Sequence, residues 1–195
     1  MVDLMPLAEE HWSSASYDDV VLAFLEAEWG KYPEPIRTQC AGLIVSPSLS
    51  SERENRIRAK FLWALREPLL THVPGDTRWF AVTHLRRQHF PELHAINHPA
   101  WTSPNDRNEL LNVACRRPER LKSEPSAWAP PILWGHQKSG PFTILEGNHR
   151  LTALAGSIDP PEFSLAVYVG LSDGKCLWHR PDADSSTDNI ARRHG

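Results

Sequence analysis

Residues 142–155 read Phe142-Thr-Ile-Leu-Glu-Gly-Asn-His-Arg-Leu-Thr-Ala-Leu-Ala155, and at Gly147 their apolar pattern changes from that of a strand to that of a helix. Residues 142–145 are mostly apolar and β-prone, which predicts a strand that ends at an acid, Glu146. Gly147 forms a turn, and residues 148–155 have the apolar spacing of a short helix. Backbone N–H groups at a helix start attract anions, so this strand–turn–helix predicts a phosphate-binding site.

The polar side chains around this turn supply the chemistry that a phosphate ester requires. Arg150 offers two parallel donors to phosphate oxygens, and the backbone of Gly147 and Asn148 completes a cradle that a ligand can approach closely. Glu146 is the candidate to hold Mg²⁺ through the phosphates or to orient a water, and His149 the candidate to move a proton. The structural alternative is that Glu146 caps the helix and pairs with Arg150, while His149 is a surface residue.

Further strands are expected on both sides of this stretch. Residues 131–136 predict a strand joined to residues 141–145 by the link 137–140, which has the length of a hairpin connection. Residues 83–89 predict one or two helical turns. Three more strands are predicted at residues 78–82, 163–171 and 175–180. The fold class is therefore mixed α/β (α+β), with a small twisted sheet built largely from the second half of the chain.

The first third of the chain has helical periodicity. Helices are predicted there over residues 17–29 and 51–66, and a further helix is predicted over residues 103–117. Ser16 is the expected N-cap of the first helix, and Pro68 is expected to end the second. The expected organisation is a helical N-terminal region at 1–75, a sheet domain with flanking helices at 76–181 and a polar tail at 182–195.

The composition restricts the class of protein. Lys and Arg number 21 against 24 Asp and Glu, a formal charge of −3, so bulk electrostatic binding of duplex nucleic acid is not expected. No stretch reaches the roughly 18 apolar residues of a membrane span. Cys40, Cys115 and Cys176 are odd in number and lack CxxC spacing, which indicates a reducing, intracellular compartment. Any DNA contact must therefore be local, and its best sources are Arg86-Arg87, Arg116-Arg117 with Arg120 and Lys122, and Arg192-Arg193. The alternative is that each of these groups is a solvated helix face or a frayed end.

Other groups of residues give weaker indications of a metal site or a catalytic site. His84, His89, His94 and His98 are spaced by five, five and four residues and interrupted by proline, so a zinc site is not expected there. Neither a Gly-x-Ser-x-Gly elbow nor a Gly-x4-Gly-Lys-Ser/Thr loop is present, and a nucleotide is therefore expected at residues 146–150. The polar residues that can complete that site are Thr83, His84, Arg86, Arg87, Asn97, His98 and Lys138.

Glu146-Gly-Asn-His-Arg150, followed by Leu-Thr-Ala-Leu-Ala155, resembles the acid-Gly-x-His-Arg-x-x-Ala pattern of the ParB/sulfiredoxin superfamily. The likeness covers residues 79–171 in layout and is specific over 130–155. The superfamily includes nucleases, nucleotide hydrolases, kinases and a sulfinic-acid reductase, all with a phosphate at this helix start. Asn148 stands where sulfiredoxins carry their reactive cysteine, which argues against the reductase. The Gly-Glu-Arg-Arg box and helix-turn-helix domain of centromere-binding ParB proteins are also missing from the sequence.

The compact size, helical first third and Trp- and Pro-rich texture resemble the plasmid fertility-inhibition proteins of this fold, the oncogenic suppression activity type. This resemblance implies ATP as a substrate, a divalent metal such as Mg²⁺, and DNA cleavage at the same site. It also implies a bacterial cytoplasmic protein that blocks DNA transfer through a conjugative type IV secretion system, with secretion components or escort proteins as partners at the inner face of the membrane. The alternative is a non-catalytic nucleotide- or protein-binding module that inhibits transfer by occupying a secretion component.

Overall fold

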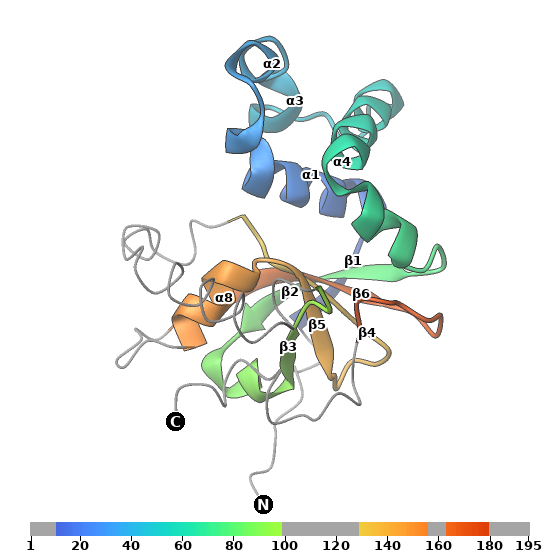
Figure 1. The fold of residues 1–195 in the computed structure, drawn as a ribbon, viewed down its shortest axis with the longest axis vertical. Helices are drawn as coiled ribbons and strands as arrows, with labels where there is room; N and C mark the ends of the chain where they lie inside the picture. Colours follow the sequence, from blue (N-terminus) through green and yellow to red (C-terminus); the bar gives the residue numbers. More distant parts are fainter. Residues whose placement is uncertain (1–10, 99–128, 156–162, 180–195) are drawn as a thin grey trace, which may run out of the picture.

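The computed structural model describes residues 11–98, 129–155 and 163–179, which form a mixed sheet with helices on both faces (Figure 1). The described residues contribute six strands in the order β1-β2-β6-β4-β5-β3. Their bounds are β1 Trp12–Ala15, β2 Arg78–Leu85, β3 Leu93–Ala95, β4 Ile132–Gly135, β5 Phe142–Glu146 and β6 Leu165–Leu171. The mixed α/β class predicted from the sequence is confirmed.

Pairing within the sheet places the carboxyl end of β5 beside that of β3. The strands β4 and β5 form the predicted antiparallel hairpin, and Leu133 lies opposite Ile144. The strands β3 and β5 run parallel, with Ala95 opposite Ile144. Because parallel strands end at the same edge of a sheet, the chain that leaves β3 passes next to the turn that follows Glu146.

The sheet buries apolar side chains on both faces because each strand alternates its side chains. One face packs Val82, Leu133 and Val167 against Leu151 of α8 (Asn148–Ala155). The other face packs Trp79, Trp134 and Leu145 against the helices of residues 17–72, which are called the helical layer below. These helices contribute Val21, Phe24 and Leu62 to the contact. Full burial of one such side chain contributes about 1.5–3 kcal/mol. The N-terminal helices therefore share one apolar core with the sheet.

The helix α1 (Tyr17–Glu28) begins where the sequence predicts. Ser16 and Asp19 form a capping box, in which Asp19 N–H donates to Ser16 Oγ at 3.1 Å and Ser16 N–H donates to Asp19 Oδ2 at 2.7 Å. Both bonds satisfy backbone donors that a helix start otherwise leaves open. The turn η2 (Trp29–Lys31) follows directly, and it carries the chain from α1 toward the short helices of the layer.

The helix α4 (Glu52–His72) corrects the prediction that Pro68 ends it. Arg66 has non-helical angles (φ −130°, ψ 24°), and the chain then resumes helical conformation up to His72, so the helix bends instead of ending. Proline lacks an N–H and its ring collides with the carbonyl four residues earlier, which explains a break just before Pro68. The bend is visible in Figure 1.

Several short elements differ from the sequence-based expectation. The strand β2 extends to Leu85, because Leu85 pairs with Leu165 of β6, and the helical turns predicted at 83–89 are displaced to η3 (Arg87–Glu92). Residues 175–179 are an irregular turn and not the predicted strand. There His179 N–H donates to Cys176 O at 3.1 Å and Trp178 Nε1 donates to Leu69 O at 3.2 Å. Within the described residues, the sequence did not predict β1, β3, η2, α2 (Glu34–Gln39) or α3 (Gly42–Val45).

The expected division at residue 75 separates the helical layer from most of the sheet, but β1 lies in the sheet and pairs with β2. The predicted helix over 103–117, the tail from 182 and the basic groups at 116–122 and 192–193 lie outside the described residues. Within the part of the chain that the structure describes, no helix combines the length and apolar character that crossing a bilayer requires.

Candidate functional site

The strand–turn–helix predicted from residues 142–155 is present as β5, Gly147 and α8. Gly147 has φ +95°, a conformation that residues with a side chain rarely adopt, and a Cβ there would lie 3.0 Å from Pro131 Cβ. Leu151 N–H donates to Gly147 O at 2.9 Å, which is the first bond of the helix. The N–H groups of residues 148–150 therefore precede the intrahelical bonds, as an anion site at a helix start requires.

The Asn148 side chain is buried and bonded within the protein. Its Oδ1 accepts from Ile96 N–H at 3.2 Å, and its Nδ2 donates to Ile144 O at 2.8 Å. The amide thus connects the chain leaving β3 with β5 and fixes the first residue of α8. The sequence predicts that Asn148 is part of the phosphate cradle. In the structure its backbone lies at the start of α8, and its side chain is bonded to Ile96 and Ile144.

Arg150 and Glu146 contact each other across one turn. Arg150 Nη2 lies 3.4 Å from Glu146 Oε1, and Arg150 Nη1 donates to Ala129 O at 2.5 Å. Both side chains are largely buried, with 16% of Arg150 and 18% of Glu146 exposed. This pairing is the one that the structural alternative describes, and it commits part of the Arg150 guanidinium to contacts inside the protein.

The helical layer brings three more charged residues to Glu146. Lys31 Nζ lies 2.6 Å from Glu28 Oε2 and 2.8 Å from Oε1, and Arg66 Nη2 lies 2.5 Å from Glu28 Oε2. The charges of all three act on the Glu146 carboxyl. Glu28, Lys31, Arg66, Glu146 and Arg150 are called the interlayer charge cluster below. Three cations against two carboxylates leave it one positive charge in excess when both acids are ionised.

Glu28, Lys31 and Arg66 were not predicted from the sequence as site residues. A signal for Glu28 was present, because it falls on the same helical stripe as the apolar Val21, Phe24 and Leu25. A charged residue in a buried stripe requires a partner, and those partners came from segments that sequence spacing does not connect.

Burial raises the pKa of Glu146 above its ordinary value, and the negative charge of Glu28 raises it further, whereas Arg150, Arg66 and Lys31 lower it. Burial and Glu28 also raise the pKa of Tyr32 to about 12, partly opposed by Arg66. Tyr32 is therefore a neutral donor, and its hydroxyl donates to Phe61 O at 2.6 Å. The raised pKa of Glu146 brings its proton exchange toward neutral pH, which suits a general acid or base.

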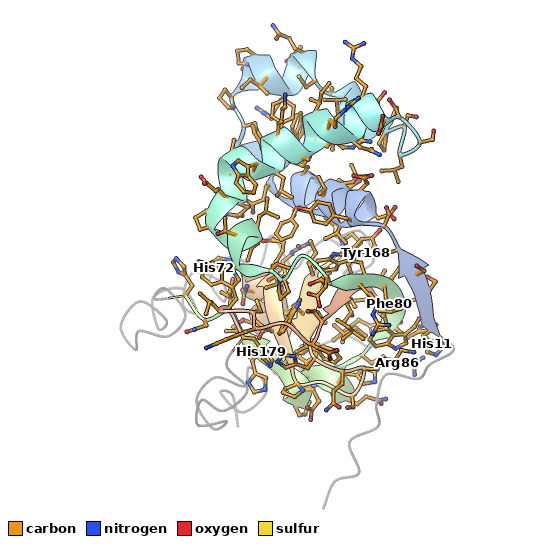
Figure 2. The ribbon with its side chains drawn as sticks, turned by 90° about the vertical axis from the view of Figure 1, so that its right-hand side faces the viewer. His11, His72, Phe80, Arg86, Tyr168 and His179 are labelled. Carbon is orange, nitrogen blue, oxygen red and sulfur yellow. The ribbon has the colours of Figure 1, made fainter. Side chains whose placement is uncertain are left out.

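Three of the other polar residues that the sequence singled out contact residues outside this turn. His84 Nδ1 lies 2.7 Å from Ser164 Oγ, Arg86 N–H donates to His89 Nδ1, and Lys138 Nζ lies over the Trp12 ring at 5.4 Å. Figure 2 shows Tyr168 next to the helical layer and Arg86 and His11 farther from it. Among the described residues, no group of three or more His, Cys, Asp and Glu side chains is arranged to hold a metal ion.

Mg²⁺ fits the charge cluster only together with phosphates. Glu146 supplies carboxylate oxygens, but the Glu28 oxygens already contact Lys31 and Arg66. Three neighbouring cations also disfavour a bare divalent ion. Magnesium in proteins is commonly held by one or two carboxylates and the oxygens of a substrate phosphate, which is the arrangement that this donor set allows.

Comparisons with known proteins do not assign the site. No family model, no curated protein and no solved structure matches the chain. The contacts and charges around Glu146, together with the sequence pattern of residues 146–150, are therefore the basis for assigning chemistry to the site.

Proposed function

We propose that the chain is a nucleotide phosphohydrolase of the ParB/sulfiredoxin type, which binds ATP at the start of α8. The observation that carries the proposal is a desolvated carboxyl, Glu146, at the turn from β5 into a helix start and inside a cluster with excess positive charge. The helix start and the cations attract phosphates, while the carboxyl supplies the acid–base group that hydrolysis requires.

The proposed reaction is attack of water on the terminal phosphorus of ATP. A new oxygen–phosphorus bond forms, the bond from that phosphorus to the bridging oxygen breaks, and the water proton leaves through Glu146 or His149. Glu146 orients the water, and the N–H groups at residues 148–150 bind the phosphate. Bound Mg²⁺ would neutralise charge on the phosphate oxygens.

Phosphate release from ATP, with Mg²⁺ and with a chelator, tests this proposal in the wild type and in Glu146→Gln. The glutamine keeps the size of the side chain and an oxygen for Arg150 but removes the acid–base function. We expect turnover to fall about 100-fold or more. Glu92→Gln is the matched control, because burial also raises the pKa of Glu92, which lies beyond the opposite end of β5. Equal turnover of wild type and Glu146→Gln would rule the proposal out.

The biological role proposed with this activity is inhibition of conjugative DNA transfer, with DNA as a second phosphodiester substrate. It is supported by the resemblance to the fertility-inhibition proteins of the oncogenic suppression activity type. Conjugation frequency in donor cells that express the wild type or Glu146→Gln tests it, in parallel with a nuclease assay on purified protein. Loss of inhibition in the variant links the role to the site.

The second candidate is a binding module without catalysis. It is favoured by the internal contacts of Arg150. The Arg150 guanidinium donates to Ala129 O and pairs with Glu146, which are contacts that stabilise the fold without a ligand. On this proposal, inhibition of transfer persists in Glu146→Gln and no phosphate is released by either protein.

A further inference from the structure

Trp63 differs from the other tryptophans that the structure describes. Five of them lie in the two apolar cores or pack against them: Trp12, Trp29, Trp79, Trp134 and Trp178. Trp63 belongs to neither core, is 48% exposed, and forms no hydrogen bond or ring contact with the described residues. Tryptophan is enriched at the centres of protein–protein interfaces, where a few large side chains supply most of the affinity. Trp63 is therefore a candidate anchor for a partner.

The helix α4 presents Trp63 on the side opposite the core. The buried side chains of α4 are Arg58, Leu62 and Leu69. Its exposed residues between positions 52 and 67 are called the α4 outer face: Glu52, Arg53, Arg56, Lys60, Trp63, Ala64 and Glu67. Spacings of three and four residues keep positions 53, 56, 60 and 63 on one side of the helix. Because α4 lies on the right of the helical layer in Figure 1, it faces the viewer in Figure 2.

Charge changes sign along the α4 outer face. Arg53 and Lys60 precede Trp63 in the helix, and Glu67 follows it. Among the described residues, none of these three charged side chains forms an ion pair, whereas Arg56 is already paired at 3.6 Å. The face thus carries unpaired cations on one side of the indole and an unpaired acid on the other. Such a pattern is complementary to itself when two copies of the helix lie antiparallel.

A twofold axis near Lys60 matches these charges. It places Arg53 of one copy beside Glu67 of the other, because both positions lie seven residues from position 60, about 10 Å along the helix. This contact occurs twice in the dimer. The bend at Arg66 precedes Glu67, which remains exposed. Each Trp63 then packs on the partner's α4 beside its Lys60, whose aliphatic stem covers the indole while the ammonium group reaches water.

We infer that the α4 outer face is the interface of a symmetric homodimer, in which Trp63 packs on the partner's α4 and Arg53 pairs with the partner's Glu67. The inference is independent of the proposed hydrolysis, since no residue of the strand–turn–helix at 142–155 takes part in the contact. A second copy fits this face better than nucleic acid or an anionic membrane, because Glu67 would lie against the negative charges of either.

Sedimentation velocity of the full chain at about 2–200 µM tests the inference. We expect a monomer–dimer equilibrium with a Kd of about 1–100 µM, because one helix from each copy makes an interface at the small end of the usual range. Trp63→Ala should raise this Kd about tenfold or more. Arg86→Glu is the control, because Arg86 is an exposed cation that Figure 2 shows away from the helical layer. It should leave Kd within about twofold of the wild type.

A charge exchange tests the antiparallel arrangement. Arg53→Glu and Glu67→Arg each place like charges in both contacts of the dimer, so each should raise Kd about tenfold. The double variant restores opposite charges across the interface and should bring Kd back to within about threefold of the wild type. Both side chains are exposed, so these variants keep the fold. Arg86→Glu changes the net charge by the same amount as Arg53→Glu and controls for that change.

A dimer that Trp63→Ala weakens and that recovers in the double variant supports the inference. A wild type that stays monomeric at the highest concentration overturns it, and so does a dimer that Trp63→Ala leaves unchanged. A double variant that associates no more tightly than the single ones refutes the pairing of Arg53 with the partner's Glu67. Growth beyond two copies would also contradict the inference, because a twofold contact closes at the dimer.

Discussion

The Arg66 guanidinium contacts the Glu28 carboxylate through Nη2 at 2.5 Å, and this pair joins the bend of α4 to the last residue of α1. Both charges act on Glu146, which lies 118 residues beyond Glu28 and 80 beyond Arg66 in the chain. The candidate site is thus assembled from three separate segments, at residues 28–31, 66 and 146–150. The helical layer is a structural part of that site and not only a cover for the sheet.

Replacing Gly147 is expected to destabilise the protein because no side chain fits its conformation. In Gly147→Ala the backbone must keep φ +95° while the new Cβ meets Pro131 Cβ at 3.0 Å, and we expect a loss of about 1–3 kcal/mol in the free energy of unfolding. Gly42→Ala is the control, since Gly42 begins α3 with nothing within 4 Å of the added Cβ. Urea denaturation measures both, and the control should be neutral or slightly stabilised.

Removing the Asn148 amide is expected to loosen the edge of the sheet at the site. Asn148→Ala leaves Ile96 N–H and Ile144 O without their partner, at about 1–3 kcal/mol for each buried group left unsatisfied. Hydrogen exchange at Ile96 should accelerate along with the loss of stability. Asn97→Ala, which removes an exposed amide bonded to Leu177 O, should have a smaller effect. Unchanged exchange at Ile96 would contradict the bridging role.

Two arginines of α4 provide a matched test of burial. Arg58 is fully buried, where it pairs with Glu54 at 3.2 Å and donates to Leu43 O and Ser48 O. Arg58→Ala should lower the free energy of unfolding by about 3–5 kcal/mol, because buried acceptors lose their donor. Arg56→Ala removes an exposed pair with Glu52 at 3.6 Å and should change it by about 1 kcal/mol or less. Thermal or urea unfolding distinguishes the two.

Stability should depend on pH through Glu146. Its pKa is raised in the folded protein above the ordinary value of 4.5, so between these two values the folded state holds a proton that the unfolded chain has released. The free energy of unfolding therefore falls as the pH rises above about 4.5, until the folded pKa is passed. Glu146→Gln removes this contribution, and its stability relative to the wild type should increase with pH.

The measurement is a series of urea denaturation curves for wild type and Glu146→Gln from pH 4.5 to 8. Burial also raises the pKa of Glu26 and Glu92, so only the difference between the two proteins reports on Glu146. A difference that is constant over this range would show that the folded and unfolded chains bind this proton equally.

Local chemistry made much of the fold predictable. The capping box at Ser16 and Asp19, the β4–β5 hairpin and the change of period at Gly147 each depend on residues close in sequence. The strand predicted at 175–180 was wrong because its alternating apolar residues, Cys176 and Trp178, are buried by contacts with the helical layer and not by pairing in the sheet. The short strands β1 and β3 were missed because cross-strand partners, and not their own residues, define them.

The strand–turn–helix at residues 142–155 follows from local sequence, since the glycine, the apolar periods and the polar residues of the turn act within a few positions of one another. The surroundings of Glu146, in contrast, depend on how distant segments pack together. Burial shifts its pKa, the Arg150 guanidinium turns to Ala129 O, and Glu28 brings Lys31 and Arg66 from the helical layer. Desolvation and charge interactions depend on distance in space, and packing of the helices on the sheet sets those distances.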